Sequence, residues 1–264
     1  MNGDARAEGK MTNGQSIPKT EYEMHDLTQF PDMRLAHDFY ESVLAQSFPR
    51  DEREPLRGLT DALSKPPESR PRIVLALDKR RNVVAGIVGE WYPHSRVLLI
   101  AYLATRPDLR GSGIGYRLTK FVSDWALERE SALIIAEIEP PDRSPVAEDY
   151  GDPVARLRLF DRLRGRVLDM PYWQPRLSPD RNRVPLLLVA FPIDSDACDQ
   201  EESEMSIPAD VISIFLGEYF NACEGEEEGV TRGLEYSTMQ NFLQGAVSVS
   251  TMPVKEYLRM HGYD

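Results

Sequence analysis

The segment LRGSGIGYRL, residues 109–118, has the residue types of an anion-binding site. Gly111, Gly113 and Gly115 stand at alternate positions, and a run with helical spacing follows them. The first backbone N–H groups of a helix have no partner within the helix, and the helix dipole favours a negative charge beside them. Glycines let a phosphate approach that backbone without a Cβ in the way. The segment therefore predicts a diphosphate site, with a turn that binds nothing as the alternative.

Two familiar phosphate motifs are excluded by the spacing of these glycines. A dinucleotide-binding loop requires G-x-G-x-x-G, and the third glycine of that pattern is missing. The pattern G-x-x-x-x-G-K-[ST] of nucleotide-hydrolysing proteins is absent as well. The remaining pattern is R-x-x-G-x-G, from Arg110 to Gly115, at the start of a predicted helix.

The hydrophobic periodicity predicts the elements that position this loop. Short connections such as KRR and PHS between apolar runs are typical of antiparallel hairpins. The predicted strands are 21–27, 72–78, 82–92, 96–105, 132–138, 166–173 and 184–193, and the predicted helices are 33–48, 51–63, 113–129 and 153–165. Asp51 is expected to cap the second helix. The helix at 113–129 between two strands indicates a parallel βαβ unit.

The regions outside these elements differ in composition. Residues 1–16 are polar and small, which predicts a disordered tail, and residues 17–194 form the main domain. Residues 195–264 are expected to be an acidic linker and a helical extension. In that extension, a wide apolar stripe runs from Val211 to Phe220 and must be covered by the chain's own sheet, which we expect, or by a second subunit.

The bulk properties exclude several classes of function. A formal net charge of -12 over 264 residues argues against nucleic-acid binding, which requires a basic surface. The two cysteines, Cys198 and Cys223, and four scattered histidines show no metal-binding spacing, so no metal is expected. No segment has the apolar core of a signal peptide or the roughly 20 apolar residues that span a bilayer. A cytoplasmic protein without membrane contact is the expectation.

The passage YLATRPDLRGSGIGYRLTKFV resembles motif A of the GNAT acyltransferases, in which a strand and short loop lead through [QR]-x-x-G-x-[GA] into a long helix. The order of the predicted elements over residues 17–193 is also similar to that family. The resemblance implies an α/β (α+β) fold with a mixed, mostly antiparallel central sheet, splayed strands and flanking helices. It also implies acetyl-CoA or another acyl-CoA as co-substrate and direct acyl transfer to an amine.

The resemblance assigns residues to the coenzyme. It implies that the backbone of one strand end bonds the pantetheine amides and that the glycine loop donates N–H groups to the pyrophosphate. The strand residues are Leu103, Ala104 and Thr105, and the loop residues are Arg110, Gly111, Ser112, Gly113, Ile114 and Gly115.

The resemblance also implies catalytic groups. An attacking amine must lose a proton, so a base is required. Glu137 matches a strand position where some GNAT enzymes acting on protein N-termini carry a glutamate, and its apolar neighbours are expected to raise its pKa. A solvent-facing Glu137 is the alternative, with Glu90 and His94 as weaker candidates for the base.

The acid that protonates the leaving thiolate is less well defined. Phe160 stands where many members of the family carry a tyrosine, and phenylalanine cannot donate a proton. Tyr172 is our candidate, and Tyr102, Tyr150 and water remain alternatives.

The acceptor and donor are open at this point. A small-molecule or peptide amine is expected, and acidic residues within 139–152, among them Asp142, Glu148 and Asp149, favour a cationic acceptor. Arginines between 156 and 166 also allow an acyl carrier protein as donor, and Phe160 allows a non-catalytic CoA-binding protein. The expected assembly is a monomer or a homodimer.

Overall fold

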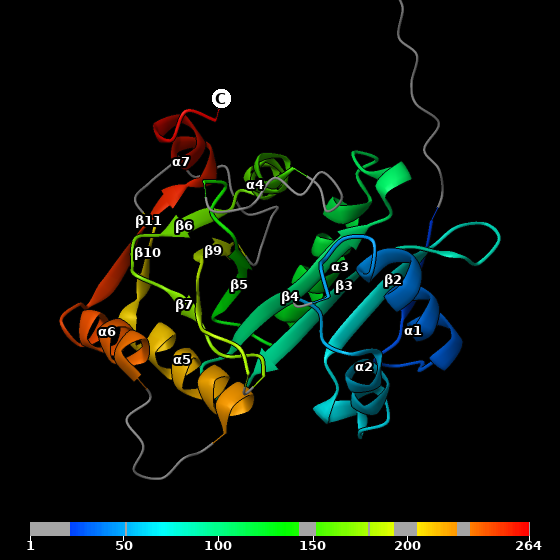
Figure 1. The fold of residues 1–264 in the computed structure, drawn as a ribbon, viewed down its shortest axis with the longest axis horizontal. Helices are drawn as coiled ribbons and strands as arrows, with labels where there is room; N and C mark the ends of the chain where they lie inside the picture. Colours follow the sequence, from blue (N-terminus) through cyan, green and yellow to red (C-terminus); the bar gives the residue numbers. More distant parts are fainter. Residues whose placement is uncertain are drawn as a thin grey trace, which may run out of the picture.

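The computed structural model of the chain describes residues 22–50, 52–142, 152–178, 180–192, 205–225 and 233–263. Its centre is a nine-stranded sheet with the order β1-β2-β3-β4-β5-β9-β6-β11-β10 (Figure 1). The strands are β1 (Glu23–Asp26), β2 (Arg72–Leu77), β3 (Val83–Tyr92), β4 (Val97–Thr105), β5 (Leu133–Ile138), β6 (Arg166–Leu168), β9 (Leu187–Phe191), β10 (Ser206–Pro208) and β11 (Ser248–Pro253). Neighbouring strands are antiparallel except β4 and β5, so the predicted mixed, mostly antiparallel sheet is confirmed.

Helices cover both faces of this sheet. They are α1 (Met33–Phe39), α2 (Leu56–Leu63), α3 (Ile114–Glu128), α4 (Pro153–Arg162), α5 (Ala209–Glu224), α6 (Gly233–Gln244) and α7 (Val254–Met260). We call the side packed against α3, α4 and α7 the α3 face. We call the other side the α5 face; α1 and α2 cover its first half, and α5 and α6 cover its second half (Figure 1).

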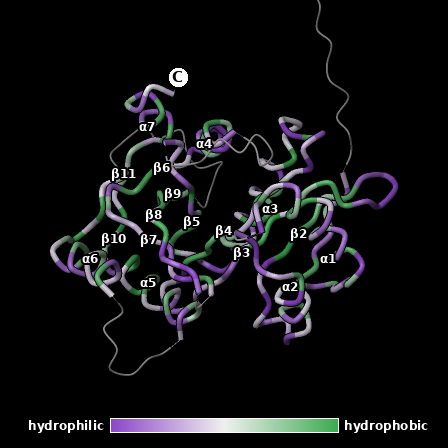
Figure 2. The backbone as a smooth tube through the Cα atoms, in the orientation of Figure 1, coloured by the Kyte–Doolittle hydropathy of each residue, from purple (hydrophilic) through white to green (hydrophobic). Residues whose placement is uncertain are grey.

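Side-chain alternation along the strands builds the two faces. In β5, Ile134 and Ala136 belong to the core of the α3 face, whereas Leu133 and Ile135 belong to the core beneath α5. Figure 2 shows that hydrophobic residues concentrate in these central strands. A strand buried on both sides has apolar residues at nearly every position, so the charged Glu137 is an exception within β5.

Most predicted elements are present, and several have shifted limits. The helix predicted at 33–48 ends as an α-helix at Phe39 and continues as a π-helical turn, Tyr40–Leu44. The helix predicted at 51–63 begins at Leu56, after Pro55, and its expected cap, Asp51, lies outside the described residues.

Two predicted strands are each divided in two. Strand 166–173 separates into β6 and β7 (Trp173–Gln174), because Pro171 between them has no N–H to donate to a ladder. Strand 184–193 separates into β8 (Val184–Pro185) and β9 at Leu186, whose N–H is donated to the carbonyl of Tyr172 instead.

The extension contains helices, as predicted, and also two strands that were not predicted from the sequence. β11 pairs with β6, and β10 pairs with β11, so this region continues the central sheet. The apolar stripe of α5 is covered within the chain, since Ile212, Phe215 and Phe220 are buried in the core beneath that helix. The predicted tail, 1–16, lies outside the described residues. Within the described part of the chain, no helix combines the length and apolar character needed to cross a membrane.

Candidate active site

The β4–β5 ladder opens midway along the two strands. Pairing runs from Val97–Leu133 to Ile100–Ala136, and beyond those residues β4 pairs with β3 and β5 pairs with β9. The opening coincides with a bulge, because Tyr102 and Ile100 pair with consecutive β3 residues and Ala101 is the extra residue. Bulges bend a strand and interrupt its pairing, which explains why the two parallel strands separate at this level.

The end of β4 forms one side of this opening. Leu103, Ala104 and Thr105 pair with β3 and make no ladder with β5 within the described strands. A strand edge of this kind presents backbone N–H and C=O groups to a ligand. The predicted pantetheine-binding residues therefore lie at the edge of the opening.

The glycine loop precedes α3, as predicted. Gly111 and Gly113 have φ values of 80° and 82°, a backbone conformation that favours glycine. Gly113 is the N-cap residue of α3, and no side chain bonds to the first turn. A Cβ at either glycine would meet no atom of the described residues within 4 Å, so these residues leave the space around the loop open. This geometry satisfies the requirements of a phosphate site at a helix start.

Two arginines lie near each other at this end of α3. Burial and the charge of Arg156, on α4, lower the pKa of Arg110. The α4 helix packs close to the loop, since a Cβ on Gly115 would lie 3.5 Å from Leu159 Cδ2. The Ser112 hydroxyl bonds to the Leu109 carbonyl at 2.6 Å. The two neighbouring guanidinium groups add positive potential where the helix dipole also favours an anion.

Glu137 is the first residue of β5 beyond the end of the β4–β5 ladder. It follows Ile135 by two positions and so points to the α5 face, where three side chains donate hydrogen bonds to its carboxylate. The Tyr172 hydroxyl donates to Oε1, Gln174 Nε2 donates to Oε2 at 2.6 Å, and the Tyr219 hydroxyl donates to Oε2 at 3.0 Å. We call these four residues the Glu137 cluster.

Burial and hydrogen bonding act on Glu137 in opposite directions. Desolvation raises the pKa of Glu137 to about 7, the nearby charge of Glu90 adds to the rise, and the three hydrogen bonds oppose it. The pKa of Tyr172 and that of Tyr219 are raised well above their usual value by burial and by the charge of Glu137. The cluster thus combines a carboxylate that titrates near neutral pH with two hydroxyls that keep their protons.

A second carboxylate lies on the same face. The Tyr92 hydroxyl donates to Glu90 Oε2 at 2.9 Å, and burial raises the pKa of Glu90. The Tyr92 ring lies 5.6 Å from the Tyr219 ring, which connects Glu90 to the Glu137 cluster. His94 is exposed in the β3–β4 turn, and its backbone N–H bonds to Glu218. Of the two weaker candidates, Glu90 is therefore the one beside the cluster.

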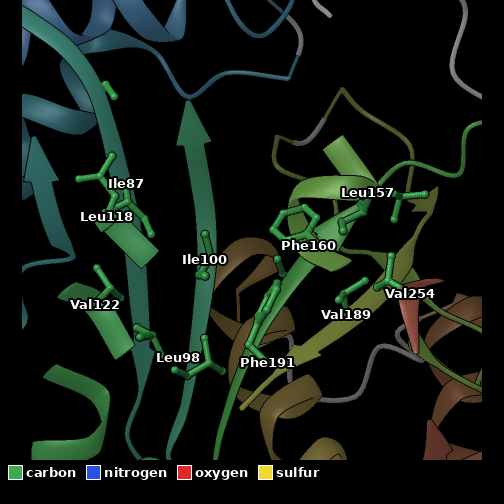
Figure 3. Close-up of a cluster of buried hydrophobic side chains, with 14 of the residues drawn as sticks. Ile87, Leu98, Ile100, Leu118, Val122, Leu157, Phe160, Val189, Phe191 and Val254 are labelled. Carbon is green, nitrogen blue, oxygen red and sulfur yellow. The ribbon is translucent and has the colours of Figure 1, made fainter. Parts of the chain in front are cut away.

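The candidates for the acid occupy different places. Phe160 is 5% exposed and packs 5.1 Å from the Phe191 ring in the core of the α3 face (Figure 3). Tyr102 accepts a hydrogen bond from the Glu54 N–H at 3.0 Å, and its hydroxyl faces the 52–54 loop. Tyr150 lies outside the described residues. Only Tyr172 among the predicted hydroxyls contacts Glu137 in the described part of the chain.

Two members of the Glu137 cluster were not predicted from the sequence. Gln174 lies in the PYWQP segment, where only Tyr172 was proposed. Tyr219 was assigned to the apolar stripe of α5, and its ring does pack there, with 3% exposure. The spacing of that stripe is the same for phenylalanine and tyrosine, so it gives no signal for the partner of the hydroxyl.

A cavity of about 210 Å³ lies on the α3 face, between α3 and the end of α4. Its lining includes Lys120, Arg162 and Arg164 and contains no carboxylate. It therefore offers no base for an amine. Within the described residues, no group of three or more His, Cys, Asp or Glu side chains is arranged to hold a metal ion.

Comparison with known families agrees with the sheet and the glycine loop. Residues 34–162 match the model of the acetyltransferase (GNAT) family, which spans α1 to α4 and includes the loop and Glu137. This part of the chain is therefore similar to a GNAT acetyltransferase domain, and the match supports acyl transfer as the general class of reaction. No curated protein sequence matches the chain.

The chain is also similar to a number of solved structures. A GNAT-family protein from Bacteroides thetaiotaomicron is 19% identical with a TM-score of 0.49, covering 64% of this chain and 86% of its own. The ribosomal-protein-S18-alanine N-acetyltransferase from Escherichia coli is 14% identical with a TM-score of 0.45, covering 68% and 99%. The loading GNATL domain of CurA from Lyngbya majuscula is 15% identical with a TM-score of 0.47, covering 66% and 98%.

Proposed function

We propose that this protein transfers an acetyl or other acyl group from acyl-CoA to an amine, with Glu137 as the general base. The observation that carries the proposal is the place of Glu137: the β4–β5 ladder ends at Ile100–Ala136, and Glu137 is the next residue of β5. A base at the edge of the opening can reach an acceptor on the α5 face while the coenzyme enters between the strands.

The residues around the opening fit the coenzyme. Gly111 and Gly113 leave the α3 N-terminus accessible for the pyrophosphate, and the free edge of Leu103–Thr105 can bond the pantetheine amides. The bound thioester supplies an activated acyl carbon and a thiolate leaving group.

In the proposed reaction, Glu137 removes a proton from the attacking amine. The amine nitrogen forms a bond to the acyl carbon, the carbon–sulfur bond breaks with its electron pair on sulfur, and Glu137 takes the N–H proton directly or through water. A base with a pKa of about 7 is well matched to neutral pH. Tyr172, which keeps its proton at neutral pH, is our candidate for the acid that protonates sulfur.

The acceptor class follows from the charge on the α5 face. Glu90 and Glu137 lie near each other there, and the pKa of Glu54 is raised by burial and by the charge of Glu90. These acidic groups favour a primary amine on a small molecule or peptide that arrives with a positive charge. Whether the assembly is a monomer or a homodimer has no bearing on this chemistry.

The test is a thiol-release assay with acetyl-CoA and a panel of peptide and small-molecule primary amines. Glu137→Gln is expected to lower kcat/KM by about 10²–10⁴-fold while leaving acetyl-CoA affinity intact by calorimetry. Glu128→Gln, an exposed carboxylate at the end of α3, is the matched control and is expected to keep full activity. Full activity of Glu137→Gln would exclude Glu137 as the base.

The same assay separates the alternative functions. An acyl carrier protein as donor requires a basic docking patch. Arg158 and Arg166 bond to neutral oxygens of Tyr263 and Thr251, which fixes the two side chains and leaves their positive charge. Transfer from an acyl carrier protein but not from acetyl-CoA would establish that donor. Tight CoA binding without thiol release for any amine would favour a non-catalytic protein.

A further inference from the structure

Tyr219 reaches the candidate base from outside the segment that matches the family model. It lies on α5, whereas that match ends at residue 162. Its hydroxyl donates to Glu137 Oε2 across 82 positions of sequence. The residue is 3% exposed, so the bond lies in the protein interior.

The hydrogen bonds on Glu137 define how its carboxylate is held. A carboxylate has about four acceptor positions on its two oxygens. Gln174 and Tyr219 both donate to Oε2, and Tyr172 donates to Oε1. Among the described residues, the remaining acceptor position is therefore on Oε1, and a proton from the acceptor amine arrives on that side.

Tyr219 is itself held firmly. Its ring lies 5.5 Å from the Phe215 ring and 5.6 Å from the Tyr92 ring. The preceding residue, Glu218, accepts hydrogen bonds from the backbone N–H groups of His94 and Ser95 at 2.9 and 2.8 Å. These contacts join α5 to the β3–β4 turn and fix the hydroxyl relative to the sheet.

The other end of α5 is anchored to the segment that carries Gln174. Glu224 accepts hydrogen bonds from the Arg176 N–H at 2.9 Å and from Arg183 Nη2 at 2.6 Å. Two of the three donors to Glu137 thus depend on α5. Tyr219 lies on this helix, and Gln174 lies in the segment that Glu224 anchors.

We propose that Tyr219 is a positioning residue for the acyl-transfer reaction, and that it orients the Glu137 carboxylate toward the acceptor amine. The C-terminal extension then forms part of the active site. This inference rests on the proposed function, in which Glu137 is the base.

The expected signature is a change in the titration of Glu137. A hydrogen bond to the charged form of an acid lowers its pKa, so loss of the Tyr219 hydroxyl must raise it. A hydrogen bond to a charged group is strong enough to move the midpoint by about one pH unit. The other titratable groups that face Glu137 are retained in this variant: Glu90 and Tyr92 on β3, Tyr172, and Cys223 on α5.

The experiment compares Tyr219→Phe with Tyr236→Phe in the full chain. Phenylalanine keeps the ring packing of Tyr219, and Tyr236 is a matched control because its hydroxyl, also in the extension, bonds to Gln240. The probe is ¹³C NMR of the glutamate carboxyl carbons, with the Glu137 signal assigned by its loss in Glu137→Gln. We expect the Glu137 midpoint to rise by about one pH unit in Tyr219→Phe and to stay at the wild-type value in Tyr236→Phe.

Kinetics with an amine from the panel provides the second measurement. The acidic limb of the pH profile of kcat/KM should move to higher pH by the same amount. In the same variant, kcat should be reduced and the KM for acetyl-CoA unchanged. In a Glu137→Gln background, Tyr219→Phe should have no further effect on residual activity. A wild-type midpoint and pH profile in Tyr219→Phe, or an additive loss in the double variant, would overturn the inference and leave the role of Glu137 intact. Retained activity of Glu137→Gln would instead reject the proposed function.

Discussion

Glu137 keeps its proton more tightly in the folded protein than in the unfolded chain, because burial raises its pKa from 4.5 to about 7. Between these two values the unfolded chain releases a proton that the folded protein retains. The folded state therefore loses stability as pH rises through this window. A buried carboxylate that lowers stability at neutral pH fits the role proposed for Glu137, because strongly shifted pKa values concentrate at functional sites.

This linkage gives a measurable prediction. Between pH 5 and pH 8, the wild-type free energy of unfolding should fall by on the order of 2 kcal/mol more than that of Glu137→Gln. Urea unfolding at the two pH values measures the difference, since other titrations are common to both proteins. Equal pH dependence in the two proteins would show that Glu137 does not titrate near 7.

Gly113 is expected to matter for two separable reasons. Its φ of 82° means that Gly113→Ala strains the backbone, by about 1 kcal/mol. The added Cβ meets no atom of the described residues within 4 Å, and it stands on the N-cap residue of α3, where the phosphate is proposed to bind. We expect weaker acetyl-CoA binding in calorimetry, by about tenfold or more, as one charge-assisted hydrogen bond is lost.

Gly262→Ala is the matched control for this substitution. Gly262 has a φ of 75°, and an added Cβ there also meets no atom of the described residues within 4 Å, but Gly262 follows α7 rather than preceding α3. We expect the two variants to lose similar amounts of stability, and only Gly113→Ala to lose affinity for acetyl-CoA. This result would support the phosphate site. Equal affinity in both variants would contradict it.

At the scale of elements, α5 is held by a buried ion pair. Arg183 Nη2 lies 2.6 Å from Glu224 Oε2, and their side chains are 8% and 9% exposed. Burial alone would raise the pKa of Glu224, but hydrogen bonds from Arg183 and Arg176 lower this pKa to about 2. The folded pKa lies below the unfolded value, so this contribution to stability is present above about pH 4.5 and is lost as pH falls toward 2.

Glu224→Gln should therefore destabilise the protein by on the order of 3 kcal/mol at pH 7, because Arg183 loses its charged partner in a buried place. The remaining bond from Arg183 to Glu235 limits the loss. Glu256→Gln, which removes an exposed pair with Arg259, should change stability by less than about 1 kcal/mol. Urea unfolding at pH 7 and pH 3 measures the change in the free energy of unfolding for both variants. If Glu224→Gln lost as little stability as Glu256→Gln, the Arg183–Glu224 pair would add little to stability.

The elements differ in how far their sequences determine them. The helical period of α3 and the apolar runs of β2 to β5 are long, so these elements were predicted nearly to their observed limits. Glu137 was proposed because it matches a strand position where some GNAT enzymes carry a glutamate, and its apolar neighbours predicted the raised pKa. β10 and β11 were missed because they are short, and β11, SVSTMP, has few apolar residues and gains its place by pairing with β6 and β10. The hydrogen bond of Tyr219 depends on tertiary packing that no local pattern encodes.

At the scale of the whole molecule, the extension shares its core with the family domain. One buried cluster contains Leu99 of β4 and Ile135 of β5 together with Phe215 and Phe220 of α5. β11 also extends the sheet through β6. The division at residue 194 that composition suggested therefore separates segments of sequence that pack against each other.

This arrangement predicts that the two segments unfold together. Exposing the α5 stripe would leave Leu99 and Ile135 uncovered, so opening the extension alone is unfavourable. Hydrogen exchange under native conditions should give the buried amides of α5 protection close to that of β4 and β5, and calorimetry should show one transition. If α5 exchanged much faster than the two strands, the extension would be a separate unit that docks on the sheet. In that case Tyr219 would leave Glu137 whenever the extension opened, and the active site would be assembled only while it was closed.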